Sequence, residues 1–290
     1  GYTKFVMDLR VQWPNDAIGS IKSELDFPLD VTMAGAQVGL GSSPQMNSDW
    51  SVMIGYYTNT NDPNDLMIDG DWAYDPTPGS VNGQFSYTES HVAMDATLLT
   101  FEARRSLFFR EKWVLGVTAE FRYQKFQQDV LDFTGWYIDG NGQEFSQSYD
   151  SLCLIYEVIY KIPAGGFYLT VRPTNGFSFT TRLLGAVVSA KDEDDHILRN
   201  RLATASGTGS GIIGGFGARF DIGKGAMRLR PFIEADGEYL SLTVKTSGDQ
   251  VWYGDDPVTP EDDTGDELHS IPHNFYSRQY QIRLRAGLSF

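Results

Sequence analysis

The stretch RLRPFIEADGEY, residues 228–239, alternates between two kinds of side chain. Successive side chains of a β-strand point to opposite faces, so a strand here would have one charged face and one apolar face. The charged face would carry Arg228, Arg230, Phe232, Glu234, Asp236 and Glu238, and the other Leu229, Pro231, Ile233, Ala235, Gly237 and Tyr239. The closing stretch YQIRLRAGLSF, residues 280–290, repeats the pattern. A soluble sandwich also alternates, but uncharged faces opposite paired charges are typical of a closed barrel in lipid.

Composition agrees with a folded β-protein and excludes several classes. Of 290 residues, 41% are apolar and 13% aromatic, and 30 are glycine, a balance rich in strand and turn formers. The net charge of -15 argues against nucleic acid as a partner. The single cysteine, Cys153, excludes an intramolecular disulfide and a cysteine-based zinc site. No apolar run reaches the ~18 residues of a membrane-spanning helix, which leaves a barrel as the membrane option.

The connections between the alternating runs differ in length. Short turns fall at 110–112, 173–176 and 222–226, and long polar segments at 62–92, 135–148, 191–206 and 247–273. Short turns on one rim and long loops on the other are usual in outer-membrane barrels, which have an even number of strands. We expect strands near 3–13, 18–40, 49–61, 93–109, 113–134, 149–172, 177–190, 207–221, 227–246 and 274–290.

The predicted fold is therefore all-β, a ten-stranded antiparallel transmembrane β-barrel of the bacterial outer membrane. It forms a single domain over residues 1–290, with no linker or repeat, and we expect a monomer with its long loops outside the cell. Several strands exceed the ~9–11 residues that cross a bilayer, so the barrel should project on the long-loop side. The charged lumen of so small a barrel argues against a porin.

Two acidic motifs fall on the long-loop rim. In MIDGDWAYDP, residues 67–76, Asp69 and Asp71 lie two residues apart, and in KDEDDHILR, residues 191–199, so do Asp194 and His196. Residues two apart in an extended segment share a face. The two pairs can therefore converge across the mouth of one barrel, as a hydrolase in which a histidine held by an aspartate acts as general base on water.

Plainer interpretations stay open at this point. The segment 67–76 can be a solvated acidic loop, or a calcium loop, although the full calcium motif is absent. His196 can be an ordinary surface histidine, and we interpret His91, His269 and His273 as solvated. The segment 247–273 has eight acids and no Lys or Arg. It either concentrates cationic peptides near the mouth or is a mobile loop kept solvated by its charge.

Over nearly its whole length the chain resembles the omptins, outer-membrane proteases of Gram-negative bacteria. DGDW at 69–72 is similar to the family's Asp-x-Asp-Trp element, and DEDDH at 192–196 to its Asp-x-Asp-x-His element. The flanking matches are SELDF at 23–27, DWSVMIGYY at 49–57, LGVTAEFRY at 115–123, KIP at 161–163 and AGLSF at 286–290. Either acidic motif alone is common by chance. Both together, each on the expected loop, form a specific signal.

The resemblance implies a role for each matching residue. Asp194 and His196 would be the catalytic pair, with His196 as the base. Asp69 and Asp71 would face them as a couple that shares a proton and stabilises the oxyanion. Asp192 would bind the substrate in the S1 pocket, which holds the side chain before the cut. This mechanism needs no metal, no cofactor and no covalent acyl-enzyme. The implied partners are a peptide or protein substrate, cationic in character, outer-membrane lipid, and lipopolysaccharide as an activator.

The chain departs from the family at the S1 pocket. The family's other pocket acid lies on the first strand, where an ungapped match places Arg10 and a gapped match Asp8. Arg10 would repel Lys or Arg before the cut, whereas Asp8 would keep basic specificity. The family's basic lipopolysaccharide contacts do not transfer cleanly either, although Arg122 and Lys125 fall near the expected strand. A catalytically inactive omptin-like barrel that serves as adhesin, receptor or structural protein is the alternative function.

Overall fold

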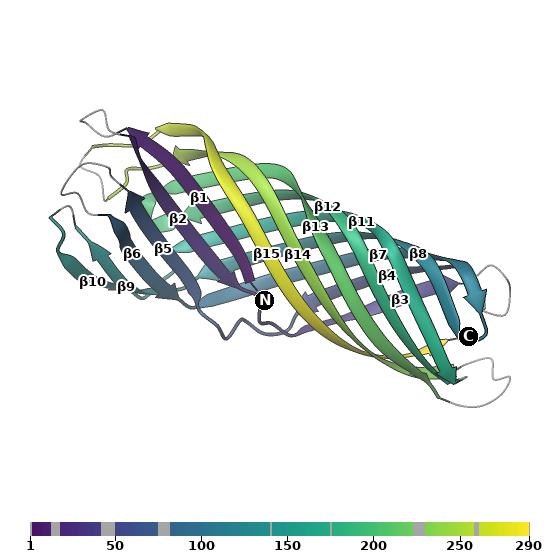
Figure 1. The fold of residues 1–290 in the computed structure, drawn as a ribbon. Coiled ribbons are helices and arrows are strands. Elements are labelled where there is room, and N and C mark those ends of the chain that lie inside the picture. The colour runs from purple at the N-terminus through teal and green to yellow at the C-terminus, as the bar shows by residue number, and fades with distance from the viewer. Residues whose placement is uncertain are drawn as a thin grey trace.

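The computed structural model describes residues 2–12, 18–41, 50–74, 82–139, 141–174, 176–222, 230–257 and 261–289. Figure 1 shows an elongated barrel of tilted strands, as the alternating sequence predicts. No helix among these residues is long and apolar enough to cross a membrane. The elements are β1 Tyr2–Gln12, β2 Ile18–Pro28, β3 Met33–Gly41, β4 Trp50–Asn59, β5 Met67–Tyr74, β6 Gly83–Ser90, β7 Val92–Arg110, β8 Trp113–Val130, β9 Phe133–Ile138, β10 Glu144–Tyr149, β11 Leu154–Thr174, β12 Phe177–His196, the 3-10 turn η1 Ile197–Arg199, β13 Arg201–Asp221, β14 Arg230–Trp252 and β15 Glu267–Ser289.

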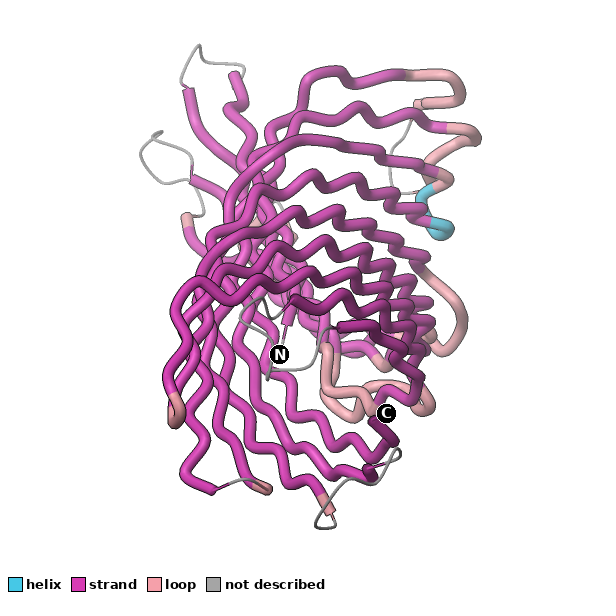
Figure 2. Tube along the Cα trace, turned by 90° about the vertical axis from the view of Figure 1, so that its right-hand side faces the viewer, coloured by secondary structure: helices cyan, strands magenta, loops and turns pink. Residues whose placement is uncertain are grey.

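All strands pair antiparallel in one sheet, in the order β10-β9-β6-β5-β2-β1-β15-β14-β13-β12-β11-β8-β7-β4-β3. Each of the first five segments in this order is adjacent in the chain to one of the last five. For example, β10 is followed by β11, and β2 is followed by β3. The sheet therefore runs around the barrel and meets the continuations of its own strands. Figure 2 shows this curvature from another side. The half that carries β5, β6, β9 and β10 is the mouth half, and the opposite half, with the 111–112 turn, is the turn half.

The described residues form fifteen strand segments, because several of the expected strands are interrupted. At the interruptions, polar side chains accept hydrogen bonds from backbone N–H groups that would otherwise pair with a neighbouring strand. Asp30 accepts from the backbone N–H groups of Asn64 and Asp65 at 2.9 and 3.2 Å. Asp132 accepts from the N–H of His91 at 2.8 Å, between β6 and β7.

The outer face of the turn half is apolar, as a lipid-facing band requires. Beyond it, towards the mouth, four lysines lie on the outer wall: Lys125, Lys161, Lys191 and Lys245. Asp192, Asp194 and His196 of the second acidic motif follow Lys191 on β12, farther towards the mouth. Strongly exposed residues of the band include Leu183 (64%), Val187 (62%), Ile212 (57%), Phe216 (73%), Ile282 (88%) and Leu284 (80%).

Charged side chains fill the lumen of the turn half, as expected. Arg122 is fully buried and donates to both carboxylate oxygens of Glu238, at 2.5 and 2.7 Å. Arg182 donates to Glu120 at 2.9 Å, and Arg283 pairs with Asp236 at 2.6 Å. A cavity of only about 50 Å³ remains among these groups.

The wall is less complete between β3 and β15. The mouth half is bridged there by β1, which pairs with both β15 and β2. In the turn half, among the described residues, β3 pairs with β4 alone and the part of β15 after Arg278 with β14 alone. A cavity of about 700 Å³ lies inside this seam. Arg285 reaches across it to Gln37 at 2.5 Å.

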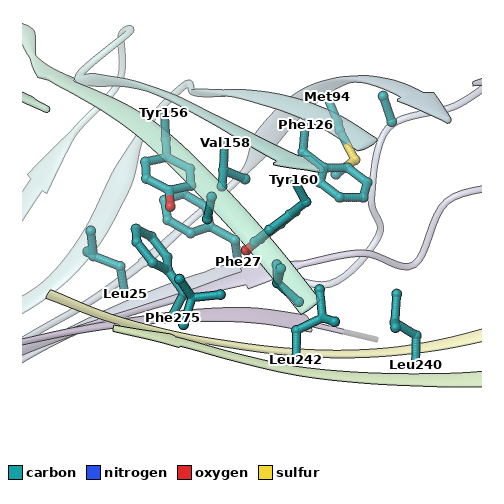
Figure 3. Packing of buried hydrophobic residues seen from close by; sticks show 14 of the residues in the cluster. Leu25, Phe27, Met94, Phe126, Tyr156, Val158, Tyr160, Leu240, Leu242 and Phe275 are labelled. Atoms are coloured by element: carbon teal, nitrogen blue, oxygen red, sulfur yellow. The ribbon is translucent and has the colours of Figure 1, made fainter. Parts of the chain in front are cut away.

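Apolar side chains form a buried layer between the lumen network and the mouth (Figure 3). Phe27 and Tyr156 stack face to face with ring centroids 4.3 Å apart, and Phe126 meets Tyr160 edge-on at 6.4 Å. The single cysteine, Cys153, is buried at the edge of this layer, as its small apolar character predicts. This apolar layer separates the charged lumen from the two acidic motifs at the mouth.

Candidate active site

Asp69 and Asp71 lie in a strand and not in the loop that the sequence predicted for 62–92. The strand β5 pairs with β2 on one edge and β6 on the other. Asp69 is opposite Leu25 of β2, whose side chain is buried on the inner face, and Asp71 is opposite Ser23. Both carboxylates therefore face the barrel interior at the mouth. Asp75 lies outside the described residues.

The second motif lies at the end of β12, which runs to His196 instead of ending at residue 190 as expected. Its side chains alternate, with Lys191 and Glu193 exposed and Asp192 and Asp194 buried on the inner face. His196 follows on that face, and its Nε2 lies 3.3 Å from Oδ2 of Asp194. Asp192, Asp194 and His196 are thus together on one strand, with the Asp194–His196 contact that the spacing predicts.

The two motifs face one another closely enough to interact electrostatically. Burial raises the pKa of Asp69 well above its ordinary value, and the charges of Asp71 and Asp194 raise it further. The pKa of Asp71 is also raised by burial, against the opposing effects of the Ser23 hydrogen bond and the charge of His196. One oxygen of Asp69 and one of Asp194 are buried without a hydrogen-bond partner among the described residues. The geometry therefore leaves acceptors for a water or a substrate between β5 and β12.

Arg201 is a site residue that the sequence motifs did not reveal. It is the register partner of His196 across the β12–β13 hairpin. Burial lowers the pKa of its guanidinium, which the carboxylate of Asp194 opposes. Its Nε is buried without a hydrogen-bond partner in the part of the chain that the structure describes, and its guanidinium lies 5.9 Å from the Trp252 ring. No sequence signal pointed to it, because 191–206 was expected to be a long loop, whereas the hairpin places Arg201 directly beside His196.

His273 is buried, so its interpretation as a solvated histidine is wrong. The strand β15 begins at Glu267 and not near 274, which brings His273 onto its inner face with 1% exposure. Burial lowers its pKa to about 4, and the charge of Asp194 opposes this shift. His91 and His269 are exposed, as expected, and pair with Asp132 at 2.8 Å and Asp249 at 3.3 Å.

Asp192 lies deeper than the other site acids. It is 3% exposed and accepts a hydrogen bond from the backbone N–H of Ala205 at 3.0 Å. Burial raises its pKa to about 8, with a further contribution from Asp194. The side chains of Asp8 and Arg10, the alternatives for the second pocket acid, lie outside the described part of the structure. Their choice stays a prediction.

Part of the acidic segment 247–273 packs against the turn that carries His196. The carboxylate of Asp256, fully buried, accepts from Nε and Nη2 of Arg199 at 2.8 and 2.7 Å. Trp252 donates to the same carboxylate at 3.3 Å, and Asn200 donates to the backbone of Asp255 at 2.7 Å. The interpretation of this whole segment as a solvated, mobile loop is therefore wrong for 252–256, which holds η1 in place.

The family model that matches the chain is that of the omptin family, over residues 10–214. The chain belongs to the omptin family. Among solved structures it is similar to the crystal structure of the outer membrane protease OmpT from Escherichia coli, with a TM-score of 0.66 and 13% identity over 99% of this chain and 92% of that one. At this identity the match shows the fold alone, an outer-membrane barrel. A search of curated proteins found no match. The family and the barrel fold predicted from the sequence are thus confirmed.

Proposed function

We propose that this omptin is an active outer-membrane endopeptidase in which Asp194 and His196 activate water opposite the Asp69–Asp71 couple. The observation that carries the proposal is the 3.3 Å contact between Asp194 and His196 on the inner wall, facing the two half-buried carboxylates of Asp69 and Asp71. A histidine oriented by a carboxylate and open on its other side has the geometry of a general base. The side chain of His196 is 22% exposed, so water can reach it.

The proposed reaction uses only protein groups and water. Nε2 of His196 faces Asp194, which leaves Nδ1 to take a proton as the water oxygen bonds to the peptide carbonyl carbon. Asp194 stabilises the imidazolium that forms. The Asp69–Asp71 couple, holding one shared proton, donates a hydrogen bond to the developing oxyanion. His196 then returns the proton to the leaving amine as the C–N bond breaks. No metal or cofactor enters these steps.

Charge at the mouth favours a cationic peptide as the substrate. No Lys or Arg occurs from Ser51 to Phe101 or from Gly248 to Asn274, and both segments reach the mouth. A mainly acidic rim raises the local concentration of cationic ligands. Asp192, on the inner face below Asp194, is the group that we propose for the S1 pocket. Its buried position makes its protonation state decisive for specificity.

The test compares two histidines that each contact an aspartate. His196→Ala should lower cleavage of a dibasic fluorogenic peptide by at least ~10²-fold, since general-base catalysis contributes 10²–10⁴. His91→Ala removes the exposed pair with Asp132 and should leave cleavage unchanged. Both variants should retain heat-modifiable migration on gels. Full activity in His196→Ala contradicts the mechanism, and a folded wild type that cleaves no peptide indicates the inactive barrel that serves as adhesin, receptor or structural protein.

We further propose lipopolysaccharide as an activating partner at the outer wall. In the strand register, Ile159 lies between Lys125 and Lys191, and Lys161 and Lys245 lie one row nearer the apolar band. Ammonium groups at this height would meet anionic headgroups. Arg122, which the family comparison placed near this site, faces the lumen instead and is buried. Refolding with and without lipopolysaccharide, before the same peptide assay, tests this partner, and Lys161→Gln should weaken the activation.

A further inference from the structure

We infer that the inner face of the β9–β10 hairpin is a remote subsite of the substrate cleft that binds a cationic side chain of an extended polypeptide. Its four aromatic residues, Phe133, Tyr137, Phe145 and Tyr149, are called the aromatic shelf. This inference rests on the proposed function, because it names where the substrate continues beyond the site of the cut.

The strand register places the shelf on the same face as the catalytic couple. Asp71 pairs with Ser86, Ser86 with Tyr137, and Tyr137 with Phe145, in a row that crosses β5, β6, β9 and β10. Residues paired across neighbouring strands share a face of the sheet. At ~4.8 Å per strand, Tyr137 lies about 10 Å and Phe145 about 14 Å from Asp71 along this row. An extended chain covers that distance in roughly three to four residues.

The rings of the shelf are arranged in two stacked pairs with open surface. Tyr137 and Phe145 lie 5.4 Å apart between centroids and nearly parallel, at 21°, and Phe133 and Tyr149 lie 5.9 Å apart at 20°. Tyr137, Phe145 and Tyr149 remain 40%, 36% and 41% exposed. Aromatic rings that stack beside one another and still face solvent can accept another flat or cationic group.

The charge around the shelf selects the kind of side chain. No Lys or Arg occurs from Phe126 to Tyr160, whereas the hairpin itself carries Asp139 and Glu144. A guanidinium or ammonium group placed over these rings gains a cation–π contact and the attraction of nearby carboxylates, and meets no like charge on the hairpin. The continuity with the catalytic face and this charge identify the occupant as a cationic stretch of the substrate chain.

The same hairpin supplies its own control. Trp136 pairs with Tyr87 on the opposite face of the sheet, with their rings stacked 6.4 Å apart. If stacked rings only stabilise the hairpin, substitution on either face should have the same effect. If the inner rings bind substrate, only the inner face should matter.

The experiment measures how peptide length affects binding and cleavage. A short dibasic peptide is compared with versions extended by four residues, with an Arg at the end, on the N-terminal or the C-terminal side. With His196→Ala as the binding protein, fluorescence anisotropy should show about tenfold tighter binding for one extended peptide. The gain should disappear with Tyr137→Ser and Phe145→Ser together, and persist with Trp136→Ser. Tyr137→Leu with Phe145→Leu keeps the hairpin apolar and should also lose the gain.

The outcomes separate the shelf from the catalytic proposal. If neither extended peptide binds more tightly than the short one, or if Trp136→Ser loses the gain as fully as the inner pair, the shelf is overturned. Cleavage of the short peptide by the wild type then still stands as a test of the chemistry. If the length-dependent gain depends on the inner rings while the wild type cleaves nothing, the shelf stands as a peptide-binding surface and the catalytic proposal fails.

Discussion

If Asp192 lines the S1 pocket as proposed, the preference for a basic residue before the cut should depend on pH. Burial raises its pKa to about 8, so a large part of the molecules carry a neutral acid here near neutrality. A neutral carboxylic acid attracts a substrate Lys only weakly, whereas a carboxylate attracts it strongly. Activity toward basic substrates should therefore rise as Asp192 ionises, independently of the other groups of the site.

The magnitude follows from the fraction ionised. With a pKa near 8, about 10% of Asp192 is ionised at pH 7 and about 90% at pH 9. The pH dependence of kcat/KM reports the pKa values of the free enzyme. If only the ionised form accepts Lys, kcat/KM for a Lys peptide should rise about ninefold relative to a matched Gln peptide between pH 7 and pH 9.

The assay takes the ratio of kcat/KM for the two peptides at half-unit steps of pH from 6 to 9.5. The ratio cancels titrations that affect both substrates equally, such as those of the catalytic groups. Asp192→Asn should make the ratio flat. A wild-type ratio that is already flat over this range would refute the assignment of Asp192 to the pocket, and a ratio that falls with pH would contradict the direction of the shift.

Three further outcomes are expected. Asp69→Asn should lower kcat/KM by about 10²-fold without loss of heat-modifiability, because it removes the proton-sharing couple that stabilises the oxyanion; full activity in this variant would contradict that role. Asp192→Asn should raise stability in urea more at pH 9 than at pH 5: the wild-type folded state keeps this carboxyl protonated up to about pH 8 while the unfolded chain releases the proton near pH 4, so wild-type stability falls as pH rises between these values. Glu238→Gln should destabilise the barrel by about 3–5 kcal/mol, since it leaves the buried Arg122 without its main charge partner, and a change below about 1 kcal/mol in urea titration would show that the network tolerates the loss.

The fold was predictable because lipid and lumen impose opposite requirements on alternate residues of every strand. The face of 230–239 that the sequence marked as charged points inward, where Asp236 and Glu238 meet Arg283. The other face carries Ile233, exposed to the surroundings by 53%. The alternation of charged and apolar side chains every two residues is visible without knowledge of any contact. The sequence alone therefore assigns the side chains of this strand to the lumen or to the lipid.

Strand ends were not predictable in the same way. Beyond the membrane both faces of a strand can be polar, so the alternation that marks a strand disappears while the hydrogen-bonded ladder continues. Met67–Tyr74, and Glu144–Tyr149 except for its last residue, fell in expected loops, because each strand is short and lies in a polar stretch of sequence. His273 was misjudged for the same reason, because the expected start of its strand was placed seven residues too late, at 274 instead of Glu267. The placement of Asp194 with His196, and of Asp69 with Asp71, on one face was predictable because it depends only on residues two apart.

The mouth gathers carboxylates that a protein selected for stability alone would separate. Asp69, Asp71, Asp192 and Asp194 lie on the inner face of two opposing strands, and burial raises the pKa of the first three. Raised pKa values mean that ionising these groups costs folding free energy near neutral pH. Arg201 opposes part of that cost, since its charge lowers the pKa of both Asp69 and Asp71. The extended ladder of the mouth half holds these acids close together, so their repulsion is retained. In the proposed mechanism this repulsion favours one proton shared between Asp69 and Asp71.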